Sequence, residues 1–186
     1  MKESSHRSSS IVWGTVFLFA CGLAYEPLYH IVRDSLAYSI IPQDDFYYYY
    51  LTAKHFALAG FSSFDGIVPT NGYHPLWMLA LAGLSALSHG NDATTFILLE
   101  VVQILSAVVT AALTLRLFRN LYGDGPWVPA ISLLVALLLT VLIFLSMETV
   151  VAIPLYLLFG LAVFQALEDQ SGVREAFWCG AAGTLL

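Results

Sequence analysis

Charged residues are scarce in this chain. Only 11 % of its 186 residues are Asp, Glu, Lys or Arg, whereas a water-soluble domain carries roughly 25 %. Hydrophobic residues make up 59 %, and the mean hydropathy is +0.77. This composition excludes an ordinary soluble domain and predicts an all-α, polytopic transmembrane protein. The net charge of −6 says little about partners, and we expect no nucleic acid among them.

Cysteine is also scarce, and no cleavable signal is evident. Cys21 and Cys179 lie far apart inside apolar segments, which excludes a disulfide framework and a zinc site. The first apolar run, 11–25, is not followed by a small-x-small cleavage pattern. We therefore interpret it as a signal anchor.

Apolar runs divide the chain into expected membrane helices. Residues 1–10 form a polar, disordered cytoplasmic tail, and a membrane helix over 11–32 leads into a long external loop, 33–94. The later membrane helices are expected at 95–118, 127–145 and 149–167, with an incomplete one at 175–186.

The segment 75–88 decides the topology. Its 14 residues would rise about 21 Å as a helix, which is shorter than a hydrocarbon core of about 30 Å. We expect it to be a juxtamembrane helix, because Arg116 and Arg119 then lie on the cytoplasmic side with the basic N-terminal tail. If 75–88 spanned the membrane instead, these arginines would face the opposite side.

Two acidic positions share one face of the membrane in this topology. Two crossings separate Asp45 from Glu148, so both carboxylates lie on the non-cytoplasmic side. Glu148 lies between two uncharged apolar helices, where it is either a functional carboxylate at the membrane edge or an ordinary loop residue.

Asp44 and Asp45 are adjacent carboxylates beside an apolar segment. Mutual repulsion and partial desolvation make this pairing costly, which indicates a cationic partner such as a metal ion or a substrate group. They begin an expected short helix, about 45–59, on which Asp45 and Tyr49 share a face. The alternative is that the aspartates cap this helix and that the tyrosines at 47–50 belong to an aromatic interface belt.

A turn-rich aromatic run covers residues 61–77 and contains His74. Gly66, Asn71 and Gly72 supply turn chemistry, and we assign Asp65 to the same turn structure. His74 is a candidate base, metal ligand or phosphate partner. The alternative is that His74, which precedes Pro75, makes only a structural hydrogen bond.

These elements together resemble the GT-C superfamily of integral-membrane glycosyltransferases. The resemblance is carried by Asp44-Asp45-Phe46-Tyr47-Tyr48, by Asn71-Gly72-Tyr73-His74-Pro75-Leu76-Trp77, and by Met147-Glu148-Thr149. It covers about residues 10–170 and looks closest to bacterial enzymes related to lipid A aminoarabinose transferases and protein O-mannosyltransferases. In that fold the first external loop carries an acidic motif and two juxtamembrane helices.

The resemblance implies a hexosyl or pentosyl transferase in a bacterial-type cytoplasmic membrane, with a cytoplasmic N-terminus. A sugar would pass from a polyprenyl-phosphate donor to an acceptor on the non-cytoplasmic face with inversion. Asp44 or Asp45, with Glu148, would be catalytic, and Asp45 and Glu148 would hold a divalent metal ion.

Substrate binding is expected from His74, Tyr73 and Tyr49, and membrane lipid is a further expected partner. Members of the family continue through further helices that help to bind the donor, so the chain is interpreted as the N-terminal portion of such an enzyme. The alternative is a non-catalytic membrane subunit or an inactive truncated product.

Overall fold

The computed structural model describes residues 12–25, 44–145 and 147–169, and within them all side chains except those of Asp44 and 166–169. The expected tail at 1–10, the end of the first helix and the incomplete helix at 175–186 lie outside these ranges. The described residues confirm an all-helical chain, whose one strand-like pairing is an isolated bridge between Ser63 and Pro69. Its helices are Val12–Tyr25, α2 (Asp44–Ala59), α3 (Pro75–Leu87), α4 (Asp92–Tyr122), α5 (Val128–Ile143) and α6 (Thr149–Asp169).

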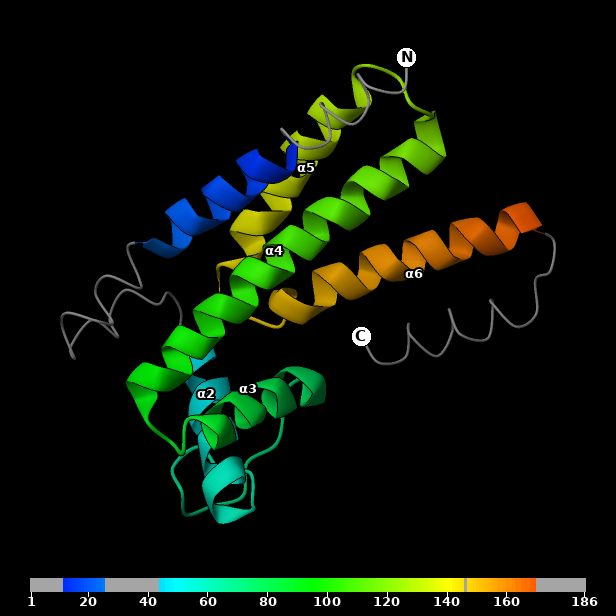
Figure 1. Cartoon of the computed structure of the whole chain (residues 1–186). Coiled ribbons are helices and arrows are strands. Elements are labelled where there is room, and N and C mark those ends of the chain that lie inside the picture. The colour runs from blue at the N-terminus through cyan, green and yellow to red at the C-terminus, as the bar shows by residue number, and fades with distance from the viewer. Residues whose placement is uncertain (1–11, 26–43, 146, 170–186) are drawn as a thin grey trace.

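Helix α4 is the central element of the fold (Figure 1). Its 31 residues rise about 46 Å, and it is the one described helix that is both long and apolar enough to cross a membrane. It extends beyond the expected 95–118 at both ends. The Asn91 side chain accepts a hydrogen bond of 2.9 Å from the Thr94 amide at its start, and the helix ends before Gly123, where φ is +74°.

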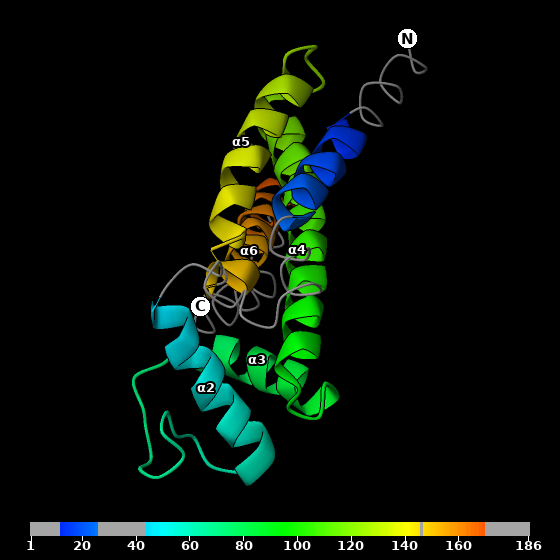
Figure 2. The same cartoon turned by 90° about the vertical axis from the view of Figure 1, so that its left-hand side faces the viewer.

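The other long helices pack around α4. Helix α5 runs antiparallel to α4, and α6 packs against α4 at an angle (Figures 1 and 2). The N-terminal helix packs against α4 and α5 through Val16, which is buried with Ala111 and Ala136. Such small residues allow helix backbones to approach closely.

Helices α2 and α3, with the loop between them, form the α2–α3 layer at the end where α4 begins. Figure 2 shows this layer lying across that end of the bundle. Its core contains Phe46, Trp77 and Leu81, all fully buried, and the Phe46 ring packs 5.9 Å from that of Phe96 on α4. The aromatic side chains of α2 thus anchor the layer to the first turns of α4.

The loop between α2 and α3 is ordered around Asp65. Asp65 Oδ1 accepts hydrogen bonds from the amides of Ile67 and Val68, at 2.8 and 2.9 Å, and from the Ser63 hydroxyl at 3.0 Å. The hydrogen bond donated by the Val68 amide, and next to it the one donated by the Ile67 amide, hold the pKa of the Asp65 carboxyl below its usual value. This is the turn role that the sequence predicts for Asp65.

Candidate functional site

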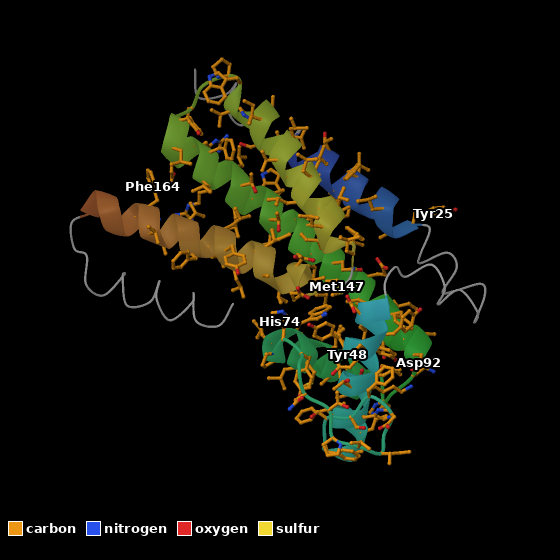
Figure 3. The ribbon with its side chains drawn as sticks, turned by 180° about the vertical axis from the view of Figure 1, so that it is seen from behind. Tyr25, Tyr48, His74, Asp92, Met147 and Phe164 are labelled. Atoms are coloured by element: carbon orange, nitrogen blue, oxygen red, sulfur yellow. The ribbon has the colours of Figure 1, made fainter. Side chains whose placement is uncertain are left out.

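The turn between α5 and α6 lies at the same end of the molecule as the α2–α3 layer. Because α5 runs antiparallel to α4, the chain that leaves α5 returns to the end where α4 begins. Figure 3 shows Met147, two residues before α6, close to His74, the residue before α3. This geometry brings the motif at residues 147–149 to the same end of the molecule as the motifs at 44–48 and 71–77.

The side chains of Glu148 and His74 approach each other in this site. Glu148 Oε1 lies 3.9 Å from His74 Nε2, with the glutamate side chain 33 % exposed and the imidazole 55 % exposed. The second oxygen, Glu148 Oε2, is buried and has no hydrogen-bond partner among the described residues. Burying a carboxylate oxygen without a partner is costly, because it gives up hydration without gaining a hydrogen bond.

Local structure explains the position of each side chain. Glu148 is the N-cap of α6, since its carbonyl accepts the Ala152 amide at 2.8 Å. His74 is the N-cap of α3, and Pro75 follows it at the first helical position, where proline is favoured. The His74 side chain makes no capping hydrogen bond within the described chain, so its ring is available to the site.

Tyr49 completes the cluster from α2. Its side chain is 9 % exposed, and its ring stacks on His74 with centroids 6.4 Å apart and an interplanar angle of 23°. Burial raises the pKa of Tyr49; a hydrogen bond with the His74 backbone lowers it, and the charges of Glu148 and then Asp45 raise it further. Tyr49 therefore lies within electrostatic reach of both carboxylates.

The remaining candidate residues lie around this cluster. Asp45 is exposed one turn before Tyr49 on α2, and the Asp44 side chain lies outside the described residues. Tyr73 is partly buried and packs against the core shared by α2, α3 and α4. The structure thus brings Tyr49, His74 and Glu148 together, with Asp45 one turn from Tyr49 on α2, while their chemical roles stay predictions.

An apolar groove of about 410 Å³ opens beside the cluster, between α3, α4 and α6. Leu76 and Val150 line it, each two residues from His74 and Glu148 respectively. Leu105 of α4 and Leu155 of α6 continue the apolar lining away from the cluster. The groove is therefore an apolar surface lined in part by residues that follow His74 and Glu148 closely in the chain.

Sequence reasoning missed Asp92 as the link between α2 and α4. Its Oδ1 accepts a hydrogen bond of 2.5 Å from the Tyr50 hydroxyl and pairs with the Lys54 ammonium. The Asn91-Asp92 pair before an apolar run is a helix-start signal, but its partners on α2 are visible only in the fold.

No group of three or more His, Cys, Asp or Glu side chains that could hold a metal ion occurs in the described ranges. In this site, Glu148 and Asp45 are the two carboxylates whose charges act on Tyr49. Comparisons of the chain with protein-family models, with curated proteins and with solved structures found no match.

Proposed function

We propose that this chain is the N-terminal part of an integral-membrane glycosyltransferase of the GT-C type. It would move a sugar from a polyprenyl-phosphate donor to an acceptor on the non-cytoplasmic face of the membrane. The observation that carries the proposal is the meeting of Glu148, His74 and Tyr49, which come from three separate helices, beside an apolar groove.

The chemistry proposed for the cluster is a direct displacement at the anomeric carbon. The acceptor hydroxyl attacks that carbon, its bond to the donor phosphate breaks, and the hydroxyl proton passes to a carboxylate. Glu148 would accept that proton, since its side chain is 33 % exposed beside His74. Asp45, exposed at the start of α2, would orient the acceptor, and His74 would donate to the departing phosphate.

The groove suits the lipid part of the donor. Its lining side chains are apolar apart from Ser106, and it begins next to the proposed phosphate position at His74. A polyprenyl chain in this groove would leave the bilayer laterally and present its phosphate to the polar cluster.

A divalent cation is a further part of the proposal. Carboxylate oxygens are the hard donors that such an ion prefers, and Glu148 and Asp45 are the two carboxylates whose charges act on Tyr49. These two residues would hold the ion, which would supply charge neutralisation of the donor phosphate.

The membrane arrangement is also proposed. The N-terminal helix, α4, α5 and α6 would cross the bilayer, with the chain's N-terminus cytoplasmic and the α2–α3 layer lying along the outer surface. In support of this, α3 is the shortest of the described helices: its 13 residues would rise only about 20 Å, against a core of about 30 Å.

The direct test is sugar transfer by membranes that contain the complete reading frame to which this chain belongs. Radiolabelled polyprenyl-phosphate sugars are supplied, and release of free polyprenyl phosphate is measured with and without chelator. Transfer that depends on Glu148 supports the proposal. A chain that neither binds a polyprenyl phosphate nor transfers sugar is instead a non-catalytic membrane subunit.

A further inference from the structure

Pro154 lies inside α6 and leaves one backbone carbonyl without its helical partner. In an α-helix the carbonyl of residue 150 accepts the amide of residue 154, and proline has no amide hydrogen. The affected carbonyl belongs to Val150, whose side chain is 1 % exposed, two residues after Glu148. A buried carbonyl in this position needs another donor.

Ser106 of α4 supplies that donor. Its hydroxyl donates a hydrogen bond of 2.5 Å to the Val150 carbonyl, and the serine is 9 % exposed. Proline is tolerated inside membrane helices where a neighbouring serine or threonine satisfies the carbonyl in this way. The first turn of α6 is therefore tied to α4 at one point.

Gln103 of α4 makes a second such bond, to the end of α5. Its Nε2 donates to the Ile143 carbonyl, at 3.2 Å, at the last residue of α5. Gln103 and Ser106 lie about one helical turn apart on the same face of α4. The two bonds thus hold the chain before and after Glu148.

We infer that Ser106 is a positioning residue: its bond to the carbonyl freed by Pro154 fixes the first turn of α6 so that Glu148 faces His74 and Tyr49. The inference about catalysis rests on the proposed function, whereas the geometric part does not. Glu148 is the N-cap of α6, so a rotation or shift of that first turn moves its side chain directly.

The test is a double-variant cycle on Ser106 and Pro154. Ser106→Ala leaves the Val150 carbonyl buried without a donor, which should lower the ratio of folded to unfolded protein by about tenfold. Pro154→Ala restores the amide at position 154, which can then satisfy the Val150 carbonyl within α6. In that background Ser106→Ala should have little effect.

Two readouts separate positioning from general stability. The first is cross-linking by a short bifunctional thiol reagent between His74→Cys and Glu148→Cys, with Cys21 and Cys179 replaced by Ala. We expect Ser106→Ala to slow this reaction several-fold with Pro154 present and to leave it unchanged with Pro154→Ala. The second is turnover of the complete enzyme, where kcat should fall with Ser106→Ala when Pro154 is present and should not fall further when Pro154 is replaced by Ala.

Ser132→Ala is the matched control. Ser132 is also buried, at 1 % exposure, but its hydroxyl bonds to the Val128 carbonyl of its own helix, at 2.7 Å. It should leave cross-linking unchanged. Equal slowing by Ser106→Ala in both backgrounds, or no slowing in either, overturns the inference. If no variant shows turnover but the cross-linking cycle holds, the proposed function fails and the geometric inference stands.

Discussion

Glu148 Oε1 lies 3.9 Å from His74 Nε2, and the two residues are the N-caps of two different helices. An N-cap has a non-helical backbone and a side chain that leaves the helix at its end, so two facing N-caps can direct two side chains at one point. The positive ends of both helix dipoles also favour negative charge there. This arrangement suits the phosphate of the proposed donor.

The first prediction concerns the carboxylates. In the complete enzyme, Glu148→Gln and Asp45→Asn should each lower turnover by about 10²-fold or more, because each removes a proton acceptor or an orienting charge. Both changes are nearly isosteric, so the amount of folded protein in membranes should be unchanged. Turnover is measured as release of polyprenyl phosphate.

Asp65→Asn is the matched control for these variants. Asp65 carries the same charge but bonds to its own turn, so its loss should cost far less turnover. Near-normal turnover by Glu148→Gln would show that Glu148 is an ordinary loop residue without a catalytic role.

The second prediction concerns topology. Asn91 and Asn120 are both exposed, and they lie near opposite ends of α4. With the native cysteines replaced, a cysteine at position 91 should react with an impermeant thiol reagent in intact cells. One at position 120 should react only after permeabilisation, because the basic end of α4 is expected inside. The reverse pattern would overturn the arrangement.

The third prediction concerns the bonds that hold α2 to α4. Asp92→Asn removes the charge that pairs with Lys54 and weakens the acceptor for Tyr50. Because these groups are partly exposed, the free energy of unfolding should fall by only about 1 kcal/mol. Thermal unfolding in detergent, together with the rate of proteolysis within α2, measures the effect.

The exposed ion pair at the other end of α4 provides the comparison. Arg119 Nε lies 3.5 Å from Asp124 Oδ1, and the aspartate side chain is 83 % exposed. Asp124→Asn should therefore change the unfolding free energy by less than about 0.5 kcal/mol. Equal effects of the two variants would show that Asp92 does not tie the helices together.

The fourth prediction concerns pH. The hydrogen bonds donated by the Val68 and Ile67 amides hold the folded-state pKa of the Asp65 carboxyl below its usual value. The stability that Asp65 gives the turn is therefore fully present above about pH 4, the unfolded value, and is lost as the pH falls through the lower folded value. The amide resonances of Ile67 and Val68 should shift with a midpoint below pH 4. Asp65→Asn should abolish that titration, and a midpoint above pH 4 would contradict the bonding.

The sequence predicted the short helices well because their signals are local. Pro75 at the start and the apolar run after it predicted α3 to within a residue at each end, at Pro75–Leu87 against 75–88. Asp44 at the start of an aromatic run predicted α2 equally closely. Helix α4 is longer than expected, since its capped ends extend beyond the apolar run that marked it.

The contacts of the candidate site were only partly predictable. Counting crossings indicated that Glu148 and Asp45 share one face, but it could not show that Tyr49 stacks on His74 between them. The bond from Ser106 to Val150 was also beyond sequence reasoning. Pro154 reveals a free carbonyl, but any nearby hydroxyl on another helix could have satisfied it.

The short turn between α3 and α4 would be the pivot of any tilt of the α2–α3 layer. His89 and Gly90 both have positive φ there, and a side chain on Gly90 would meet Leu58 Cδ1 at 2.8 Å, so the pivot is tight. His74 lies at the far end of α3, about 20 Å from the pivot, so a tilt of about 5° would move it by about 2 Å. Tyr49 and His74 would move together with the layer, and both would move away from Glu148, which belongs to α6. Spin labels at the exposed positions Leu79 of α3 and Tyr156 of α6 would detect this separation, and a distance that stays constant when donor is added would exclude it.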